Sequence, residues 1–255
     1  MGRLGHIAGS GRRWIYLASI AGAFFAASYA LVLTDESVVD PYVEEDGVVE
    51  TVGAAALFAA SCFFAFAAIR SRKRKQRLSK QLALALLAVA FFVGAGEEIS
   101  WGQRLLGVEP PADVREANRQ GELNIHNLRL VEDWISIERL FQAFWAVYGI
   151  LIPLACAISE RARHRIEAVI PVLPVWVAVA LVLNQALGEA TTLLLDSDPD
   201  LYSGAVPVEQ ARFEVTETNV ALVLMAGAIA VFKAIPRPVS VTERRPASDP
   251  TGVSA

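Results

Sequence analysis

Two stretches of this 255-residue chain carry most of the side chains that could do chemistry. The first, GEEISWGQRLLG over residues 96–107, sets two glutamates side by side. The second, NRQGELNIHN over residues 118–127, sets a glutamate four residues before a histidine. Carboxylates with one imidazole suit Mg²⁺, Mn²⁺ or Ca²⁺, or a mixed Zn²⁺ or iron site, and they also serve as general acids and bases. The candidate catalytic and metal-binding residues are therefore Glu97, Glu98, Glu122 and His126.

The same stretches hold amides and a cation that could orient a substrate. On a helix, Glu97, Trp101 and Arg104 would share one face, so that Arg104 neutralises Glu97 while Trp101 lies at the membrane interface. Such an anchored helix end is the structural alternative to a site, and a solvated Glu122–His126 pair is the alternative for the second stretch. If the stretches form one site, the substrate-orienting residues are Trp101, Gln103, Arg104, Asn118, Gln120, Asn124 and Asn127.

The chain around these stretches has the composition of a membrane protein. Hydrophobic residues make up 54% of it and charged residues 20%, whereas a typical soluble domain is about 25% charged. A bilayer core about 30 Å thick needs about 20 helical residues, and long uncharged segments predict an all-α bundle of six transmembrane helices. The predicted spans are 14–33, 48–69, 81–100, 138–158, 168–188 and 214–233, within a domain of residues 1–236 that precedes a disordered cytoplasmic tail, 237–255.

Lysine and arginine predict the orientation of this bundle, because cytoplasmic loops carry an excess of them. With both termini in the cytoplasm, 17 of the 23 basic residues lie inside and six outside. The expected location is the bacterial plasma membrane, with the lipid bilayer as partner. A net charge of -4 gives no basic surface for nucleic acid. The chain also has no phosphate-binding glycine-rich loop, so no nucleotide or flavin is expected.

Other predicted helices place further glutamates at the same depth in the membrane as those of the first stretch. Counting about 20 residues from the cytoplasmic ends of four helices leads to a common outer level that holds several glutamates. A carboxylate at this depth is costly unless it faces the bundle interior, a cation or water, although a short or tilted helix would also explain any single one. We expect the outer loop to re-enter partly and bring His126 to Glu97 or Glu98. Further candidate metal ligands are Glu50, Glu189, Glu214 and Glu217.

The pair GEEISWGQRLLG and NxQGExNxHN resembles the signature of an uncharacterised family of bacterial polytopic membrane proteins. The acidic segment 44–50 and the glutamate-bearing start of the sixth span are similar as well, so the resemblance covers roughly residues 44–230. It implies an integral membrane protein and no particular reaction. A weak analogy links the chain to CAAX-type membrane proteases. Their motif has an arginine where this chain has Gly102, and of the two histidines they need only His126 lies on the outer side.

Three functions remain open at this point. The first is a membrane-embedded, metal-dependent enzyme of hydrolase type that acts on a lipid or peptide and holds one divalent metal ion. The second is a cation- or proton-coupled transporter or ion-binding protein that uses the same carboxylates. The third is a membrane scaffold in which the polar layer only specifies helix packing.

Overall fold

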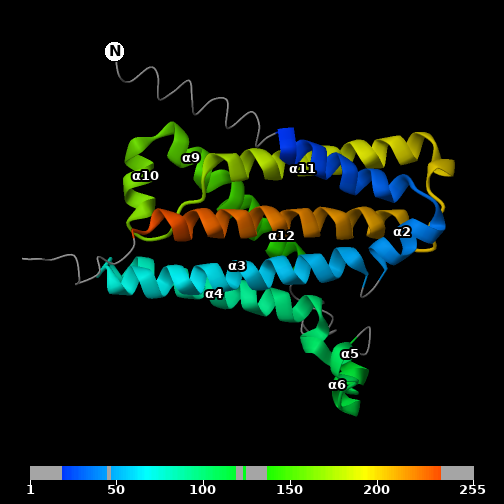
Figure 1. The fold of residues 1–255 in the computed structure, drawn as a ribbon, viewed down its shortest axis with the longest axis horizontal. Coiled ribbons are helices and arrows are strands. Elements are labelled where there is room, and N and C mark those ends of the chain that lie inside the picture. The colour runs from blue at the N-terminus through cyan, green and yellow to red at the C-terminus, as the bar shows by residue number, and fades with distance from the viewer. Residues whose placement is uncertain (1–18, 45–46, 119–122, 125–136, 237–255) are drawn as a thin grey trace, which may run out of the picture.

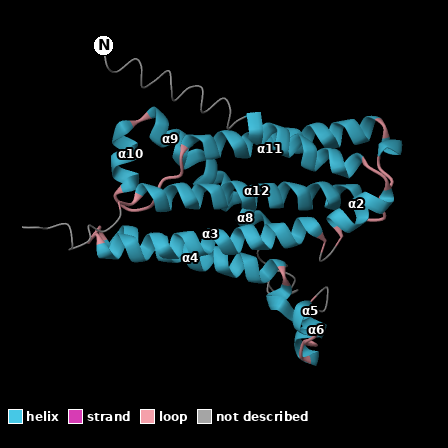
Figure 2. Ribbon diagram, in the orientation of Figure 1, coloured by secondary structure: helices cyan, strands magenta, loops and turns pink. Residues whose placement is uncertain are grey.

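A computed structural model describes residues 19–44, 47–118, 123–124 and 137–236 of the chain. The regular elements in these ranges are helices (Figures 1 and 2). Five stretches are long and apolar enough to cross a membrane, and the shorter apolar helix Ser19–Leu33 precedes them. The described residues therefore support an all-helical, multi-pass membrane protein. The five stretches are Glu36–Lys73, Leu78–Glu98, Arg139–Ile158, Val175–Ser197 and Val208–Ala234.

The first two long helices form an antiparallel pair, α3 (Val48–Lys73) and α4 (Leu78–Glu98). A short acidic helix, α2 (Glu36–Val43), precedes α3. The predicted first span, 14–33, is described only from Ser19, and the predicted tail lies outside the described residues. Five of the six predicted spans thus correspond to long apolar helices, whereas the first appears in the described residues only as a shorter apolar helix and stays a prediction.

The fourth span is interrupted in its middle. It consists of α8 (Ile137–Trp145), the π-helical segment η3 (Ala146–Leu151) and α9 (Ile152–Ile158). Gly149 in η3 has no room for a side chain, because a Cβ atom there would overlap Cδ1 of Leu181. Close packing against the next long helix thus accompanies the wider π-helical turn.

Two predicted spans have different bounds in the structure. The fifth was predicted over 168–188, but α11 runs from Val175 to Ser197, since Pro171 and Pro174 provide no backbone N–H for an earlier start. The sixth was predicted over 214–233, but α12 runs from Val208 to Ala234. Its first two turns carry charged residues, so the length of the uncharged segment underestimates this helix.

Three basic segments meet at one end of the bundle (left in Figure 1). Arg70 Nη1 donates hydrogen bonds to the carbonyl oxygens of Phe232 (3.0 Å) and Ile235 (3.1 Å), which ties the last turn of α3 to the end of α12. Ser79 Oγ donates to the Ala168 carbonyl oxygen (3.2 Å), just after α10 (Glu160–Glu167). The described parts of the basic stretches that the charge count assigned to one side of the membrane are therefore neighbours. We call this the basic end and the opposite one the acidic end.

Helix α12 lies between α11 and α3 (Figure 1) and is central to the core. The half of the core nearer the basic end is filled by large, fully buried apolar side chains. Burial of each such side chain contributes about 1.5–3 kcal/mol relative to exposure to water, and in a bilayer the same close packing holds helices together. These side chains include Phe64, Leu84, Leu173 and Val177.

Candidate functional site

Helices α3 and α12 bring their glutamates to the same depth. Thr218 Oγ1 donates a hydrogen bond to the carbonyl oxygen of Val49 (2.7 Å). A Cβ atom on Gly53 would lie 2.9 Å from the same Thr218 oxygen. Glu50 follows Val49 and Glu217 precedes Thr218, so these two glutamates lie within a helical turn of each other in depth.

Helix α4 adds two more glutamates near this level. Gly94 packs against Leu57 of α3, with 3.6 Å between an ideal Cβ and Leu57 Cδ1. A helix rises about 1.5 Å per residue, so Glu98 lies about 6 Å beyond this contact and Glu50 about 10 Å beyond it, in the same direction. The acidic half of the bundle therefore has one carboxylate layer, whose members are partly buried and none of which is free: Glu50, Glu97, Glu98, Glu214 and Glu217.

Glu189, the remaining glutamate proposed for this level, lies on the other side of α12. Gly188 approaches Thr216 Oγ1, with 3.3 Å from an ideal Cβ, so the depth agrees. However, Glu189 is 58% exposed and pairs with Arg212 at 3.6 Å. Gln185 Nε2 also donates to it at 3.4 Å. Such an exposed pair contributes little to stability, and Glu189 stands apart from the carboxylate layer.

The chain turns away from the bundle directly after α4 (Figure 1). Ser100, Trp101 and Gly102 have φ values of 45°, 56° and 76°, all in the left-handed region. That conformation costs about 1–2 kcal/mol for a residue other than glycine. The prediction that Glu97 and Trp101 share a helix face is therefore wrong. They meet through the turn instead, because Trp101 Nε1 donates a hydrogen bond to Glu97 Oε1 at 2.7 Å.

This turn also fixes the position of the indole ring. The ring lies against Gly96, where a Cβ atom would come within 2.9 Å of it, and its edge meets Phe92 with ring centroids 6.1 Å apart. Trp101 remains 41% exposed, which suits an aromatic ring at a membrane interface. One side chain thus orients the Glu97 carboxylate and borders the layer.

The second stretch returns to this turn. The backbone N–H of Leu123 donates to Gln103 Oε1 at 2.6 Å, and Asn124 Nδ2 donates to Ser100 Oγ at 3.1 Å. Asn118 Nδ2 donates to Asn124 Oδ1 at 2.7 Å. The two stretches meet, as predicted, and three of the amides expected to orient a substrate make hydrogen bonds with protein groups, while their role toward a substrate stays a prediction.

The polar side chains of this contact are almost fully buried. Ser100 is 1% exposed, Asn118 2% and Asn124 3%, and buried polar groups of this kind require hydrogen-bond partners. Between the stretches, α5 (Gln103–Leu106) and α6 (Ala112–Ala117) stand off the long helices (Figure 1). We call the contact of residues 100–103 with Leu123 and Asn124, together with the bond from Asn118 to Asn124, the loop clasp. Ser100 was not singled out from the sequence, because nothing near it marks a buried hydroxyl.

Four predicted site residues, Glu122, His126, Gln120 and Asn127, lie outside the described residues, as does the side chain of Arg104. Their roles, and the approach of His126 to Glu97 or Glu98, stay predictions. In the ranges that the structure describes, no three His, Cys, Asp or Glu side chains are arranged to hold a metal ion. A metal at the carboxylate layer would therefore need a ligand such as Glu122 or His126 in addition to the glutamates of the long helices.

A second polar cluster lies on the opposite side of α12. Tyr29 hydroxyl is 2.8 Å from Thr216 Oγ1 and donates to Asn184 Oδ1 at 3.1 Å. Asn219 Nδ2 donates to Asn184 Oδ1 and to Ser28 Oγ, both at 2.9 Å. All five side chains are at most 8% exposed, and we call them the closed network. Only Asn184 was noticed in the sequence, since pairs this distant along the chain leave no local signal.

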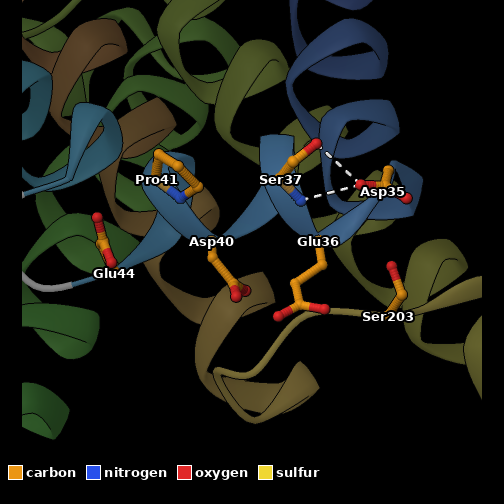
Figure 3. A pocket seen from close by; sticks show the side chains of 7 residues that line it. All are labelled: Asp35, Glu36, Ser37, Asp40, Pro41, Glu44 and Ser203. Atoms are coloured by element: carbon orange, nitrogen blue, oxygen red, sulfur yellow. Dashed lines mark hydrogen bonds between the residues drawn. The ribbon is translucent and has the colours of Figure 1, made fainter.

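An open pocket at the acidic end is lined by α2 and by Ser203 (Figure 3). The carboxylate of Asp35 accepts hydrogen bonds from the backbone N–H (3.0 Å) and hydroxyl (2.8 Å) of Ser37, which lowers the pKa of Asp35. Asp40 Oδ1 accepts from the backbone N–H of Ala205 at 2.8 Å. These two carboxylates cap a helix and fasten a loop.

Comparison of the chain with protein-family models, with curated proteins and with solved structures gives no match. The resemblance to the bacterial polytopic membrane family therefore stays a prediction. Function has to be argued from the carboxylate layer and the loop clasp themselves.

Proposed function

We propose that this chain is a multi-pass protein of the bacterial plasma membrane and a membrane-embedded, metal-dependent enzyme of hydrolase type. Its site would be the carboxylate layer, with Glu122 and His126 completing the ligands of one divalent ion. The loop clasp carries this proposal. It holds Leu123 and Asn124, which are sequence neighbours of the predicted ligands Glu122 and His126, against Gln103 and Ser100 at the turn after α4.

The cost of this arrangement supports a functional role. Two consecutive non-glycine residues, Ser100 and Trp101, are left-handed, and such strain is concentrated at active sites and ligand clamps in proteins. Carboxylates within membrane spans are costly and are usually found where they act on an ion, a proton or a substrate. Strain and charge occur here at the same place, directly after Glu98.

The residues would divide the chemistry as follows. A divalent ion supplies Lewis acidity and lowers the pKa of bound water. Trp101 holds the Glu97 carboxylate in one orientation through its indole N–H. Glu97 would then act as a ligand, and the neighbouring Glu98 as a ligand or general base. The substrate would be a lipid or peptide that reaches the layer from the outer leaflet, past the half-exposed indole ring.

The packing of the other half of the bundle favours an enzyme over a transporter. A transport path needs polar groups through to the opposite side of the membrane. In the described part of the chain, the half nearer the basic end is instead filled by buried apolar side chains such as Phe64, Leu84 and Val231. The site would therefore be reached from one side only.

Metal content of the detergent-purified protein tests this proposal. Wild type, Glu98→Gln and His126→Ala would be incubated with Mn²⁺ or Zn²⁺, desalted and analysed by mass spectrometry of the metals. We expect about one ion per wild-type chain, as in structural and catalytic sites of this ligand type. Both variants should lose that ion.

Glu189→Gln is the matched control, because Glu189 lies at the same depth but pairs with Arg212. It should keep the metal of the wild type. A folded wild type that retains no metal would overturn the enzyme proposal and leave the scaffold reading. Uptake of the metal into the lumen of proteoliposomes would identify a transporter instead.

A further inference from the structure

The basic end of the bundle carries a dense set of exposed cations. We define the basic face as the exposed Lys and Arg side chains of residues 72–77 and 161–165. The turn from residue 70 to 80 contains no acidic residue, and α10 carries three arginines and a histidine between two glutamates. None of the exposed cations of this face is paired with a carboxylate of the described residues.

Not every cation at this end belongs to the basic face, because some have tasks inside the protein. Arg70 binds the last carbonyl oxygens of α12 and lies 3.7 Å above the centre of the Phe232 ring. Arg74 Nε donates to the carbonyl oxygen of Pro236 at 3.2 Å. Within the described part of the chain, the side chains of the basic face make no such contacts and are exposed.

The geometry of α10 is that of a helix at a membrane surface. It lies across the ends of the long helices instead of along them (Figure 1). Ala162 and Ile166, four residues apart, are partly buried, while the arginines between them are exposed. Ile158, which is 88% exposed, and Val169, 50% exposed, flank the helix with apolar side chains. An apolar underside with a cationic upper side is typical of interfacial helices.

We propose that the basic face binds the phosphate headgroups of anionic phospholipids in the cytoplasmic leaflet. Unpaired like charges gathered this closely repel one another, and a surface of opposite charge relieves that repulsion. A juxtamembrane cluster of Lys and Arg is the pattern that attracts anionic lipid, and the Ser79–Ala168 hydrogen bond holds the turn and α10 as one surface. This binding is independent of the chemistry at the acidic end.

Lipid retention by the full chain in detergent tests the proposal. Phosphatidylglycerol or phosphatidylcholine would be titrated onto wild type and onto the triple variant Arg161→Gln, Arg163→Gln, Arg165→Gln, and bound lipid counted by native mass spectrometry. Wild type should prefer phosphatidylglycerol. The triple variant should bind phosphatidylglycerol at least about tenfold more weakly, with phosphatidylcholine unchanged and with the wild-type preference weakening as salt rises.

Arg115→Gln is the control, because Arg115 is an exposed arginine of α6, far from α10 along the chain. It should retain the wild-type preference. Should the triple variant fail to fold, Arg72→Gln, Lys73→Gln, Lys75→Gln removes charge from the turn and should produce the same loss. Equal retention of both lipids by wild type, or unchanged retention by a folded variant, would overturn the proposal. So would equally tight binding of soluble tripolyphosphate in the absence of lipid.

Discussion

The two polar clusters on either side of α12 are built in different ways. The closed network around Tyr29 and Asn184 consists of neutral side chains, is almost fully buried, and has short hydrogen bonds between its members. The carboxylate layer consists of acids, is only partly buried, and lies beside a strained turn and the loop clasp. Both clusters lie in the acidic half of the same bundle.

This difference separates polar groups that hold helices from polar groups that could act on something else. A network of neutral, hydrogen-bonded side chains inside a membrane protein specifies how the helices pack. Each of its hydrogen bonds stabilises the fold by about 0.6 kcal/mol or somewhat more. Charged groups at a similar depth are expensive for packing alone and usually mark function. The closed network therefore needs no ligand to explain it, whereas for the carboxylate layer we propose one.

The largest expected effect is on metal binding by the layer. Glu97→Gln removes one carboxylate charge but keeps an oxygen that can accept the indole hydrogen bond of Trp101. We expect Mn²⁺ affinity to fall about 100-fold, near the upper end of what changes around a metal site cause. The thermal stability of the metal-free protein should barely change. Calorimetric titration measures the Mn²⁺ affinity, and a melting curve measures the thermal stability of the metal-free protein. Unaltered Mn²⁺ affinity would show that Glu97 is not a ligand.

Asn184→Leu should have the opposite signature. It removes two hydrogen bonds accepted by Asn184 Oδ1 and one donated by Asn184 Nδ2 to the Thr216 carbonyl oxygen (3.1 Å), so unfolding should become easier by about 2 kcal/mol. Mn²⁺ affinity should stay at the wild-type value. Gln185→Leu, on the next residue, loses one long contact and should change the melting temperature little. Loss of metal affinity in Asn184→Leu would erase the distinction between the clusters.

Asn124→Ala tests whether the loop clasp supports the layer. The variant loses the hydrogen bond to Ser100 and one of the two from Asn118, the other being accepted by the Asn124 backbone carbonyl, which should cost about 1 kcal/mol. We expect faster hydrogen exchange over residues 100–118 and about tenfold weaker Mn²⁺ binding. Glu116→Ala, an exposed change in α6, provides the baseline. Faster exchange without any change in affinity would mean that the clasp is only structural.

The smallest effect concerns α2. The pKa of Asp35 is lowered by hydrogen bonds from Ser37, so this carboxylate stabilises the helix start above its unfolded pKa of about 3.9. That contribution is lost as the pH falls through the lower folded value. The protection factors of α2 amides, calculated against the intrinsic exchange rate at each pH, should therefore fall on acidification from about pH 5 to pH 3. Asp35→Ala should have low protection factors at both pH values, and a pH response of the protection that persists in this variant would assign the effect to other acids.

Much of the fold could be predicted from uncharged length, and the errors have local causes. Fully apolar stretches such as α3 and α4 were found nearly at their observed bounds. The start of α11 was missed although Pro171 and Pro174 signal it, and the polar first turns of α12 were excluded because they carry charge. Counting depth from the basic ends still brought the glutamates of α3, α4 and α12 to one level, because these helices are packed nearly side by side.

Contacts between distant residues were harder to predict. Tyr29 and Asn184 are 155 residues apart in the chain, and neither has neighbours that suggest the pairing. The left-handed turn at Ser100 and Trp101 is held by the loop clasp rather than by local preference, so a helix was the natural expectation there. That the two conspicuous stretches would meet could be predicted, because the second is too polar to fold alone.

An experimental structure of the wild-type chain in lipid with Mn²⁺ tests the central proposal most directly. The proposal predicts bound Mn²⁺ at the carboxylate layer, with the His126 ring at bonding or water-bridged distance from Glu97 or Glu98. A His126 ring more than about 10 Å from both carboxylates, beyond the Debye length in 0.1 M salt, would contradict it. The enzyme proposal would then have lost the imidazole on which its metal site depends.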